Sequence, residues 1–212
     1  MPEGDPVYIL GAGGHAKVVA STLLAAGYRG AGFFDDDAGK WGQTVLGLPV
    51  LGDLRQALRI EGGMAAVIGI GNNKRRREIA TTYTNIKWLS IIHPRAYVHP
   101  TVRLGRGTVI FAGAVIQPDA RIGEHCIVNT LASMDHDCNI GAFVHIAPGA
   151  HLAGNVLVGD GVLIGLGSSV IPHVSIGART VIGAGSAVVG DLPSDVTATG
   201  VPARIVTIRQ HA

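Results

Sequence analysis

The sequence is poor in the features that mark a nucleic-acid-binding, membrane or secreted protein. Its 17 Lys and Arg against 15 Asp and Glu leave a net charge of only +2, which is too weak to argue for a nucleic-acid partner. No apolar run reaches the length of a membrane span. Residues 1–5 lack the basic start and the apolar stretch of a signal peptide. We therefore expect neither nucleic-acid binding nor membrane insertion.

What the sequence has in abundance is a six-residue repeat. From Val98 to Val188 an aliphatic residue occupies every sixth position without a break, and glycine often follows it directly. A fixed short period is typical of a solenoid of short strands with aliphatics stacked inside, and the glycines are expected to relieve backbone strain near the corners. Three hexads would close one triangular coil, so the repeat predicts about five coils in a prism roughly 25 Å long.

The exposed end strands of such a prism need covers. We expect the tail from Leu192 to cover one end and the N-terminal segment to cover the other. The many glycines belong largely to the repeat, and they do not indicate disorder in a chain this rich in aliphatics.

Cysteine is scarce, and both copies fall inside the repeat. Cys126 and Cys138 each lie four residues after an aliphatic, a position whose side chain points into the prism. Twelve residues separate them, so they would line different walls. Two buried free thiols fit a cytoplasmic protein better than a disulfide would.

Before the repeat, short apolar stretches alternate with helical ones. We expect strands at residues 7–10, 32–34, 65–70 and 88–91, with helices at 16–26, 54–60 and 74–82. This alternation predicts a small Rossmann-like parallel sheet. The chain is thus expected to form an α/β domain over residues 1–90 and an all-β domain over 91–212. The basic run Lys74–Arg77 reads most simply as a solvated helix face.

The first strand-to-helix turn of this unit is rich in glycine. Gly13 and Gly14 would let a ligand approach the backbone, and the helix N-terminus favours a phosphate. Asp35 ends the second strand where a ribose-binding acid would lie, although the glycine spacing is irregular for a dinucleotide fingerprint. A tight turn without a ligand remains the alternative.

The repeat and the ending Gly200–Arg204 resemble the hexapeptide acyltransferase family. That resemblance implies a left-handed parallel β-helix over residues 91–212, because the period alone gives only a β-solenoid. The same scaffold carries several chemistries, so the fold does not identify a substrate.

With its N-terminal unit, the whole chain resembles a narrower family of bacterial nucleotide-sugar N-acetyltransferases and sialic acid O-acetyltransferases. In that family the N-terminal domain holds a nucleotide-linked sugar. The matching motifs lie at the first turn and after the second and third strands. The resemblance therefore implies substrate contacts at Gly13, Gly14, His15, Asp35, Asp36 and Gly71.

Asp135, His136 and Asp137 form a polar corner in the middle of the prism. Transfer of an acyl group from a thioester to an amine needs a base, and a neutral imidazole beside a carboxylate suits that role. An exposed corner histidine without a role remains possible on position alone. The resemblance implies that His136 is the base and that Asp137 assists it. Asn129, one coil face earlier, is a candidate substrate contact.

His145 takes an outward position in the middle of a face. The resemblance makes it an acetyl-CoA contact, and it places Leu166 and Ala184 where the backbone meets the pantetheine arm. His136 and His145 are nine residues apart, or one and a half faces, so they lie on opposite sides of one prism. A site using both must join neighbouring chains, in agreement with the homotrimers of that family. An interface histidine without a ligand is the alternative.

The remaining histidines of the repeat receive no role. We expect all four to be exposed: His99, His125, His151 and His173.

The sequence thus favours an acetyl-CoA-dependent N-acetyltransferase acting on a nucleotide-linked amino sugar, of the UDP- or GDP-4-amino-sugar type. Acetyl-CoA is a co-substrate, and no cofactor is expected to be bound permanently. Transfer should be direct, because both cysteines face inward and offer no nucleophile. O-acetylation of a sialic acid or a related sugar is the alternative. More remote are a hydratase with zinc held by His136, His145 and His151, and a non-catalytic sugar-nucleotide-binding protein.

Overall fold

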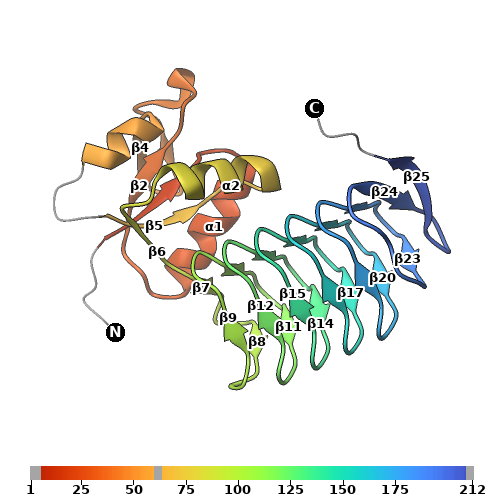
Figure 1. Cartoon of the computed structure of the whole chain (residues 1–212). Coiled ribbons are helices and arrows are strands. Elements are labelled where there is room, and N and C mark those ends of the chain that lie inside the picture. Colours follow the sequence, from red (N-terminus) through yellow and green to blue (C-terminus); the bar gives the residue numbers. More distant parts are fainter. Residues whose placement is uncertain (1–5, 60–63, 209–212) are drawn as a thin grey trace.

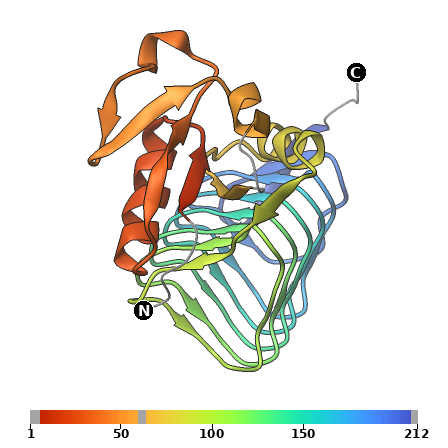
Figure 2. The ribbon, with the colours of Figure 1, turned by 90° about the vertical axis from the view of Figure 1, so that its left-hand side faces the viewer.

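The computed structural model describes residues 6–59 and 64–208. It consists of an N-terminal α/β domain with a six-stranded sheet, which lies against the flank of a three-sided prism of short stacked strands (Figure 1). A view turned by 90° shows the triangular outline of the coils, with the sheet and its helices against one side (Figure 2).

The N-terminal sheet has the strand order β3-β4-β2-β1-β5-β6. Five strands are parallel, and β3 pairs antiparallel with β4 at the edge. The strands are β1 (Val7–Leu10), β2 (Gly30–Phe34), β3 (Thr44–Val45), β4 (Leu48–Gly52), β5 (Met64–Ile68) and β6 (Ile86–Trp88). The helices are α1 (Gly14–Ala25), α2 (Asn73–Thr82) and the 3-10 helices η1 (Ala38–Lys40) and η2 (Leu54–Arg59).

The sequence predicted three of the parallel strands of this sheet, β1, β2 and β5. The strand expected at 88–91 is instead β6 at Ile86–Trp88, and Ile91 already belongs to β7 (Ile91–Ile92) of the prism. The segment expected as a helix over 54–60 is the 3-10 helix η2, and residue 60 lies outside the described residues. The hairpin β3–β4 was not predicted. Its two turn residues are Leu46 and Gly47, both with positive φ, and a leucine in the first of these positions is not among the residues that signal such a turn.

The prism has three faces, named here in the order in which the chain first visits them. The first face comprises β7, β10, β13, β16, β19, β22, β24 and β25, the second β8, β11, β14, β17, β20 and β23, and the third β9, β12, β15, β18 and β21. The first-face strands are Ile91–Ile92, Val109–Ile110, Ile127–Val128, His145–Ile146, Leu163–Ile164, Val181–Ile182, Val196–Thr199 and Arg204–Ile208.

The other two faces are built from strands of the same length. Those of the second face are Tyr97–Val98, Val115–Ile116, Ser133–Met134, His151–Leu152, Ser169–Val170 and Ala187–Val188. Those of the third face are Arg103–Leu104, Arg121–Ile122, Asn139–Ile140, Leu157–Val158 and Ser175–Ile176. The prism starts at β7, before the repeat becomes regular, and is therefore longer than the expected five coils.

The predicted inward positions are confirmed. The repeating aliphatics and the residues four places after them form one continuous buried cluster. Cys126 and Cys138 belong to it, and both are free thiols. At each corner from Gly107 to Gly185 the third residue after the aliphatic has a positive φ, so the left-handed residue is the one that ends the turn.

The glycines that directly follow the aliphatics have a different role from the one we expected. Gly105, Gly123 and Gly141 stand in one column at the corner between the third and first faces. A Cβ on Gly123 would lie 2.6 Å from the carbonyl carbon of Gly141. These glycines therefore allow the coils to stack closely, and they do not supply the left-handed conformation.

The two parts of the chain share an apolar interface. Helix α1 packs on the first face, where Ile91, Val109 and Ile127 are buried although they point out of the prism. Helix α2 lies along the corner between the third and first faces, where Asn73 Nδ2 donates to the carbonyls of Gly161 and Val162, both at 3.0 Å.

One of the two expected end covers is present. Strand β24 continues the first face and pairs antiparallel with β25, which closes the C-terminal end. The expectation that the N-terminal segment covers the other end is wrong. The N-terminal domain lies on the flank because the first-face strands of the early coils have apolar side chains that point outward. At the end of the prism, Val98 and Leu104 of the first coil remain half-buried.

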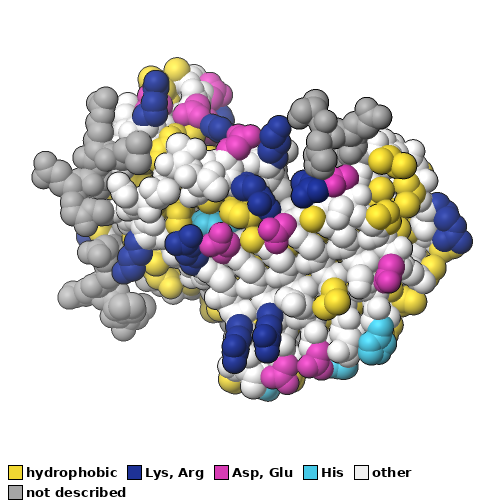
Figure 3. Space-filling view, in the orientation of Figure 1, with side chains coloured by type: hydrophobic (Ala, Val, Ile, Leu, Met, Phe, Trp, Pro, Cys, Tyr) yellow, Lys and Arg dark blue, Asp and Glu magenta, His cyan; other side chains and the backbone are white. Residues whose placement is uncertain are grey.

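The surface carries charges of both signs. Lys and Arg side chains are interspersed with Asp and Glu over the N-terminal domain and the neighbouring coils (Figure 3), and the net charge of the chain is only +2. Within the described part of the chain, every helix is too short or too polar to cross a membrane.

Candidate active site

The predicted site residues form two groups on different sides of the prism. His136 and Asp137 occupy the corner between the second and third faces, after β14. His145 lies on the first face in β16, beneath the N-terminal domain. Because the first face is opposite that corner, one chain does not bring the two histidines together.

The corner presents an imidazole with a fixed orientation. His136 Nδ1 donates to Asp137 Oδ2 at 2.8 Å, and both side chains are about half exposed. Asp137 has a φ of 58°, which turns its carboxylate back toward the ring. This hydrogen bond from His136 to Asp137 raises the pKa of the imidazole. With Nδ1 engaged, Nε2 carries the lone pair of the neutral ring, and it points past Gly154, where a Cβ would lie 2.6 Å away.

The second group lies between the N-terminal domain and the prism. The rings of His15 and His145 are 5.9 Å apart, and Gly71 lies beside both, since its Cβ would lie 3.7 Å from His15 Cγ and 3.9 Å from His145 Cε1. Asn129 Nδ2 reaches His145 Nε2 at 3.0 Å. The structure thus brings together four residues predicted from three separate segments.

Both of these histidines are neutral at physiological pH. Burial, with the nearby Arg76 charge as the second cause, lowers the pKa of His15 to about 4 and that of His145 to about 4. In His15 the Nε2 atom is buried and has no hydrogen-bond partner among the described residues. One hydrogen-bonding position of the His15 ring is thus unused within the described residues.

The start of α1 is open in the way a phosphate site requires. Gly13 and Gly14 are exposed, and a Cβ on either would meet nothing within 4 Å. Gly13 is the N-cap residue, with no side-chain cap and no acidic residue in the first turn. The first amides of the helix are thus free to bind an anion.

The two acids after β2 are held by the protein itself. Asp35 accepts from the Ala12 amide at 2.6 Å and from Lys40 Nζ at 3.1 Å. Burial alone would raise the Asp35 pKa, but these bonds and one from the Asp37 amide outweigh it and lower the pKa. Asp36 is exposed and pairs with Arg75 at 2.9 Å. Asp35 therefore fixes the shape of the first turn.

Leu166 and Ala184 lie on corners between the first and second faces. They are separated by one coil of 18 residues, and both are exposed. Adjacent coils are ~4.8 Å apart, so these residues form a short row parallel to the prism axis. The row begins one coil beyond His145, on the same side of the prism.

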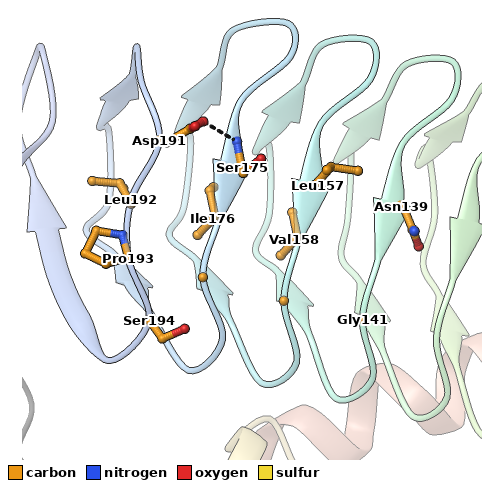
Figure 4. A pocket seen from close by; sticks show the side chains of 12 residues that line it. Asn139, Gly141, Leu157, Val158, Ser175, Ile176, Asp191, Leu192, Pro193 and Ser194 are labelled. Carbon is orange, nitrogen blue, oxygen red and sulfur yellow. Dashed lines mark hydrogen bonds between the residues drawn. The ribbon is translucent and has the colours of Figure 1, made fainter.

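A hollow on the described surface lies elsewhere. It is a groove of about 680 Å³ on the third face, and Figure 4 shows Leu157 and Ser175 along it with Asp191 at one end. Asp191 accepts from the Ser175 amide at 2.7 Å. None of the predicted site residues lines this groove. We place the site at the two histidine groups, because they carry the titratable side chains and the open helix terminus.

Two residues were misjudged from the sequence. Arg76 was placed on a solvated helix face, yet it is 1% exposed and bonded to backbone carbonyls of the prism. Its burial could have been found from spacing, because Arg76, Ile79 and Tyr83 form one buried stripe of α2 and its C-cap. His125 was expected to be exposed, and it is 1% exposed between Trp88 and Phe143.

The expected exposure of the other three histidines of the repeat agrees better with the structure. His151 and His173 are exposed and His99 is half-buried. Within the described residues, the structure contains no group of three metal-ligating side chains placed to hold an ion.

The whole chain is similar to perosamine N-acetyltransferase from Caulobacter crescentus. The sequences are 42% identical, the match covers 96% of this chain and 97% of that one, and the TM-score is 0.91. The chain belongs to the hexapeptide-repeat family of nucleotide-sugar N-acetyltransferases. The Caulobacter structure is that of a variant with one histidine replaced by asparagine, in complex with CoA and GDP-perosamine.

Two further comparisons agree with membership in this family. The PglD N-terminal domain family matches residues 6–83. The acetyltransferase domain of PglB from Neisseria gonorrhoeae, in complex with acetyl coenzyme A, is 38% identical, with 95% of this chain and 98% of that one covered and a TM-score of 0.90.

A more distant similarity covers only part of the chain. An uncharacterized protein of Acanthamoeba polyphaga mimivirus is 34% identical over 104 residues, which is 49% of this chain. The chain spans about a fifth of that relative's length, since the match covers 21% of it.

Proposed function

We propose that this protein transfers the acetyl group of acetyl-CoA to the amino group of a nucleotide-linked amino sugar, of the UDP- or GDP-4-amino-sugar type. The observation that carries the proposal is the His136–Asp137 pair, an exposed imidazole whose Nδ1 is bonded to a carboxylate at 2.8 Å. The similarity to a GDP-perosamine N-acetyltransferase along nearly the whole chain supports both the donor and the substrate class.

The base acts through Nε2. The amine nitrogen attacks the thioester carbonyl, forming the C–N bond, and Nε2 of His136 takes the proton that the nitrogen loses. As the tetrahedral centre collapses, the C–S bond breaks and coenzyme A leaves with its sulfur electrons, which accept the proton held by the His136 imidazolium and so restore the neutral base. Asp137 keeps the ring in the tautomer with a free Nε2 and stabilises the imidazolium that forms.

The nucleotide-linked sugar is assigned to the N-terminal domain. The free amides of α1 at Gly13 and Gly14 suit its phosphates, and His15, Gly71 and Asn129 line the path from there to the prism. We assign a nucleotide contact to Asp36, which is exposed and paired with Arg75, while Asp35 shapes the turn through Ala12.

Acetyl-CoA is assigned to the corner between the first and second faces, along Leu166 and Ala184 with His145 at the near end. His136 of the same chain lies at a different corner, between the second and third faces, and opposite the face that carries His145. We therefore propose a homotrimer in which each site combines His136 of one chain with His145 of its neighbour. The two buried free thiols support a cytoplasmic location.

The experiment measures coenzyme A release with UDP-, GDP-, dTDP- and CMP-linked amino sugars. His136→Asn should lower kcat about 10²–10⁴-fold, the usual contribution of a general base, with unchanged thermal unfolding because the side chain is exposed. His173→Asn, an exposed histidine at the same type of corner, is the matched control and should behave as wild type. Near wild-type turnover by His136→Asn would exclude this residue as the base.

A further inference from the structure

Arg76 is a buried cation that spans the boundary between the two parts of the chain. From α2 its Nε donates to the His125 carbonyl at 2.7 Å and one terminal nitrogen donates to the Phe143 carbonyl at 3.0 Å. The other terminal nitrogen donates to the Gly71 carbonyl at 3.1 Å. No carboxylate pairs with it among the described residues, so its charge is balanced by carbonyl dipoles alone.

Burying a guanidinium without a carboxylate partner costs free energy. Burial lowers the pKa of Arg76 to about 10, which still leaves it charged at neutral pH. A buried charge without a counter-ion persists only where its hydrogen bonds are satisfied. The planar guanidinium suits this cluster because it presents five donors in a fixed geometry, which a lysine does not.

The carbonyl of Gly71 links Arg76 to the candidate site. That same oxygen lies 3.3 Å from His145 Nδ1. Because a carbonyl only accepts, Nδ1 must carry the proton, and Nε2 must then be the acceptor. Asn129 completes the chain. Its Oδ1 accepts from the Thr130 amide at 2.8 Å, which leaves Nδ2 to donate to His145 Nε2 at 3.0 Å.

Docking of the two parts does not depend on Arg76 alone. Asn73 donates to two prism carbonyls, and Arg77 on the same helix pairs with Asp160 at 3.4 Å and lies 4.6 Å from the centre of the Phe143 ring. Arg76 contributes to the docking through the carbonyls of His125 and Phe143, and it also donates to Asn73 Oδ1 at 2.8 Å. Its further contribution is the bond to Gly71, the residue that lies between His15 and His145.

We propose that Arg76 is a positioning residue that holds the Gly71 carbonyl against His145 and thereby fixes the Nδ1–H tautomer and the ring orientation of His145. This inference rests on the proposed function, since it fixes the sugar-binding turn relative to the acetyl-CoA side of the same site. One guanidinium sets the geometry between the two substrates without touching either.

The first test does not require activity. In the full-length protein labelled with ¹⁵N, the ring nitrogens of His145 are assigned by comparison with His145→Gln. The wild type should show a protonated Nδ1 and an unprotonated Nε2 at pH 7.5. A protonated Nε2 would overturn the proposal, whether or not the protein acetylates any sugar.

The second test compares Arg76→Lys with Arg77→Lys, which keep the charge at neighbouring positions of α2. Arg76→Lys loses the fixed fork, so His145 should show a mixture of tautomers, and kcat should fall about 10–100-fold, as expected for a misplaced site. The KM values should change less. Arg77→Lys should retain the wild-type tautomer and kcat.

Thermal unfolding of Arg76→Lys and Arg77→Lys is measured alongside, so that a loss of stability is not mistaken for a loss of positioning. A single Nδ1–H tautomer with wild-type kcat in Arg76→Lys would refute the proposal. So would a loss of kcat that Arg77→Lys shares equally. If Arg76→Lys does not fold, the wild-type tautomer still tests the Gly71–His145 contact on which the proposal depends, and a protonated Nε2 would still overturn it. If the wild type shows the expected tautomer but releases no coenzyme A with any amino-sugar nucleotide, the proposed function fails and the tautomer assignment stands.

Discussion

The chemistry proposed for His136 depends most on one neighbouring side chain, Asp137, which bonds to its ring. Asp137 adopts a left-handed φ of 58° at the corner, and this conformation brings its carboxylate within 2.8 Å of His136 Nδ1. Asp and Asn tolerate that conformation better than most residues. The same feature that closes the coil therefore orients the base.

Asp137→Asn should alter the pH dependence of the reaction. The hydrogen bond to Asp137 raises the pKa of His136, and the base works only when neutral, so activity rises as the pH passes above that pKa. Removing the carboxylate should lower the pKa and move the acid limb of the kcat/KM profile to lower pH. The profile with a saturating co-substrate measures this shift.

The amide can still accept from Nδ1, so kcat on the alkaline plateau should fall less than in His136→Asn. An acid limb that stays in place would show that Asp137 does not tune the imidazole. Asp135→Asn is the comparison at the adjacent position. The Asp135 carboxylate accepts from the His136 amide and not from the ring, but its charge also raises the pKa of the imidazole, so the acid limb should move less than in Asp137→Asn.

The coils approach each other most closely at a column of glycines along one corner. Gly105, Gly123 and Gly141 stack at intervals of 18 residues, and a Cβ on Gly123 would lie 2.6 Å from one backbone atom and 2.7 Å from another. Backbone cannot move aside as a flexible side chain can. The element therefore tolerates only glycine at these positions.

Gly123→Ala should lower the free energy of unfolding by about 1–3 kcal/mol or more, the range for overpacking a tight interior. Gly190→Ala is the control, since a Cβ there meets nothing within 4 Å and the φ is not in the left-handed region; its effect should stay within about 0.5 kcal/mol. Chemical denaturation of both variants measures the difference. Equal stabilities would mean that the coils can separate at little cost.

The whole molecule is expected to respond to acid through its buried histidines. Burial lowers the pKa of His15, His125 and His145 to about 4 each, below the ordinary value of about 6.5 that applies to the unfolded chain. Between these two values the unfolded state binds more protons than the folded state. The free energy of unfolding should therefore fall as the pH decreases through this window.

Denaturant unfolding at pH 7.5 and at pH 5 measures this dependence. His125→Phe should reduce it, because a phenyl ring can keep the stack with Phe143 while it removes one titrating group and a buried Nδ1 that lacks a partner. A wild-type protein that is equally stable at both pH values would contradict the neutral state of all three histidines.

The proposed homotrimer can be tested through the two histidines that would form each site. If each site joins His136 of one chain to His145 of the next, then inactive His136→Asn subunits and inactive His145→Ala subunits should complement each other. After dissociation and remixing, some mixed trimers contain a site with both histidines intact, and coenzyme A release should partly return. If remixing restores no activity although subunit exchange is verified, His136 and His145 do not meet in one site between subunits.

The sequence alone determined the prism. Stacking of identical coils imposes a six-residue period on the chain, and so the inward residues, the two free thiols and the corner position of His136 could be read without coordinates. The same register also placed His145 on the opposite side. Local spacing was sufficient because every coil contacts only its neighbours.

Only the tertiary structure decided how the N-terminal domain meets the prism. Arg76 lies in a basic run that is typical of a solvated helix, and its burial depends on carbonyls of His125 and Phe143, 49 and 67 residues further along the chain. Likewise, nothing local predicts that His145 lies beside Gly71 and His15. These contacts join segments that are distant in sequence, and packing between domains leaves no periodic signal.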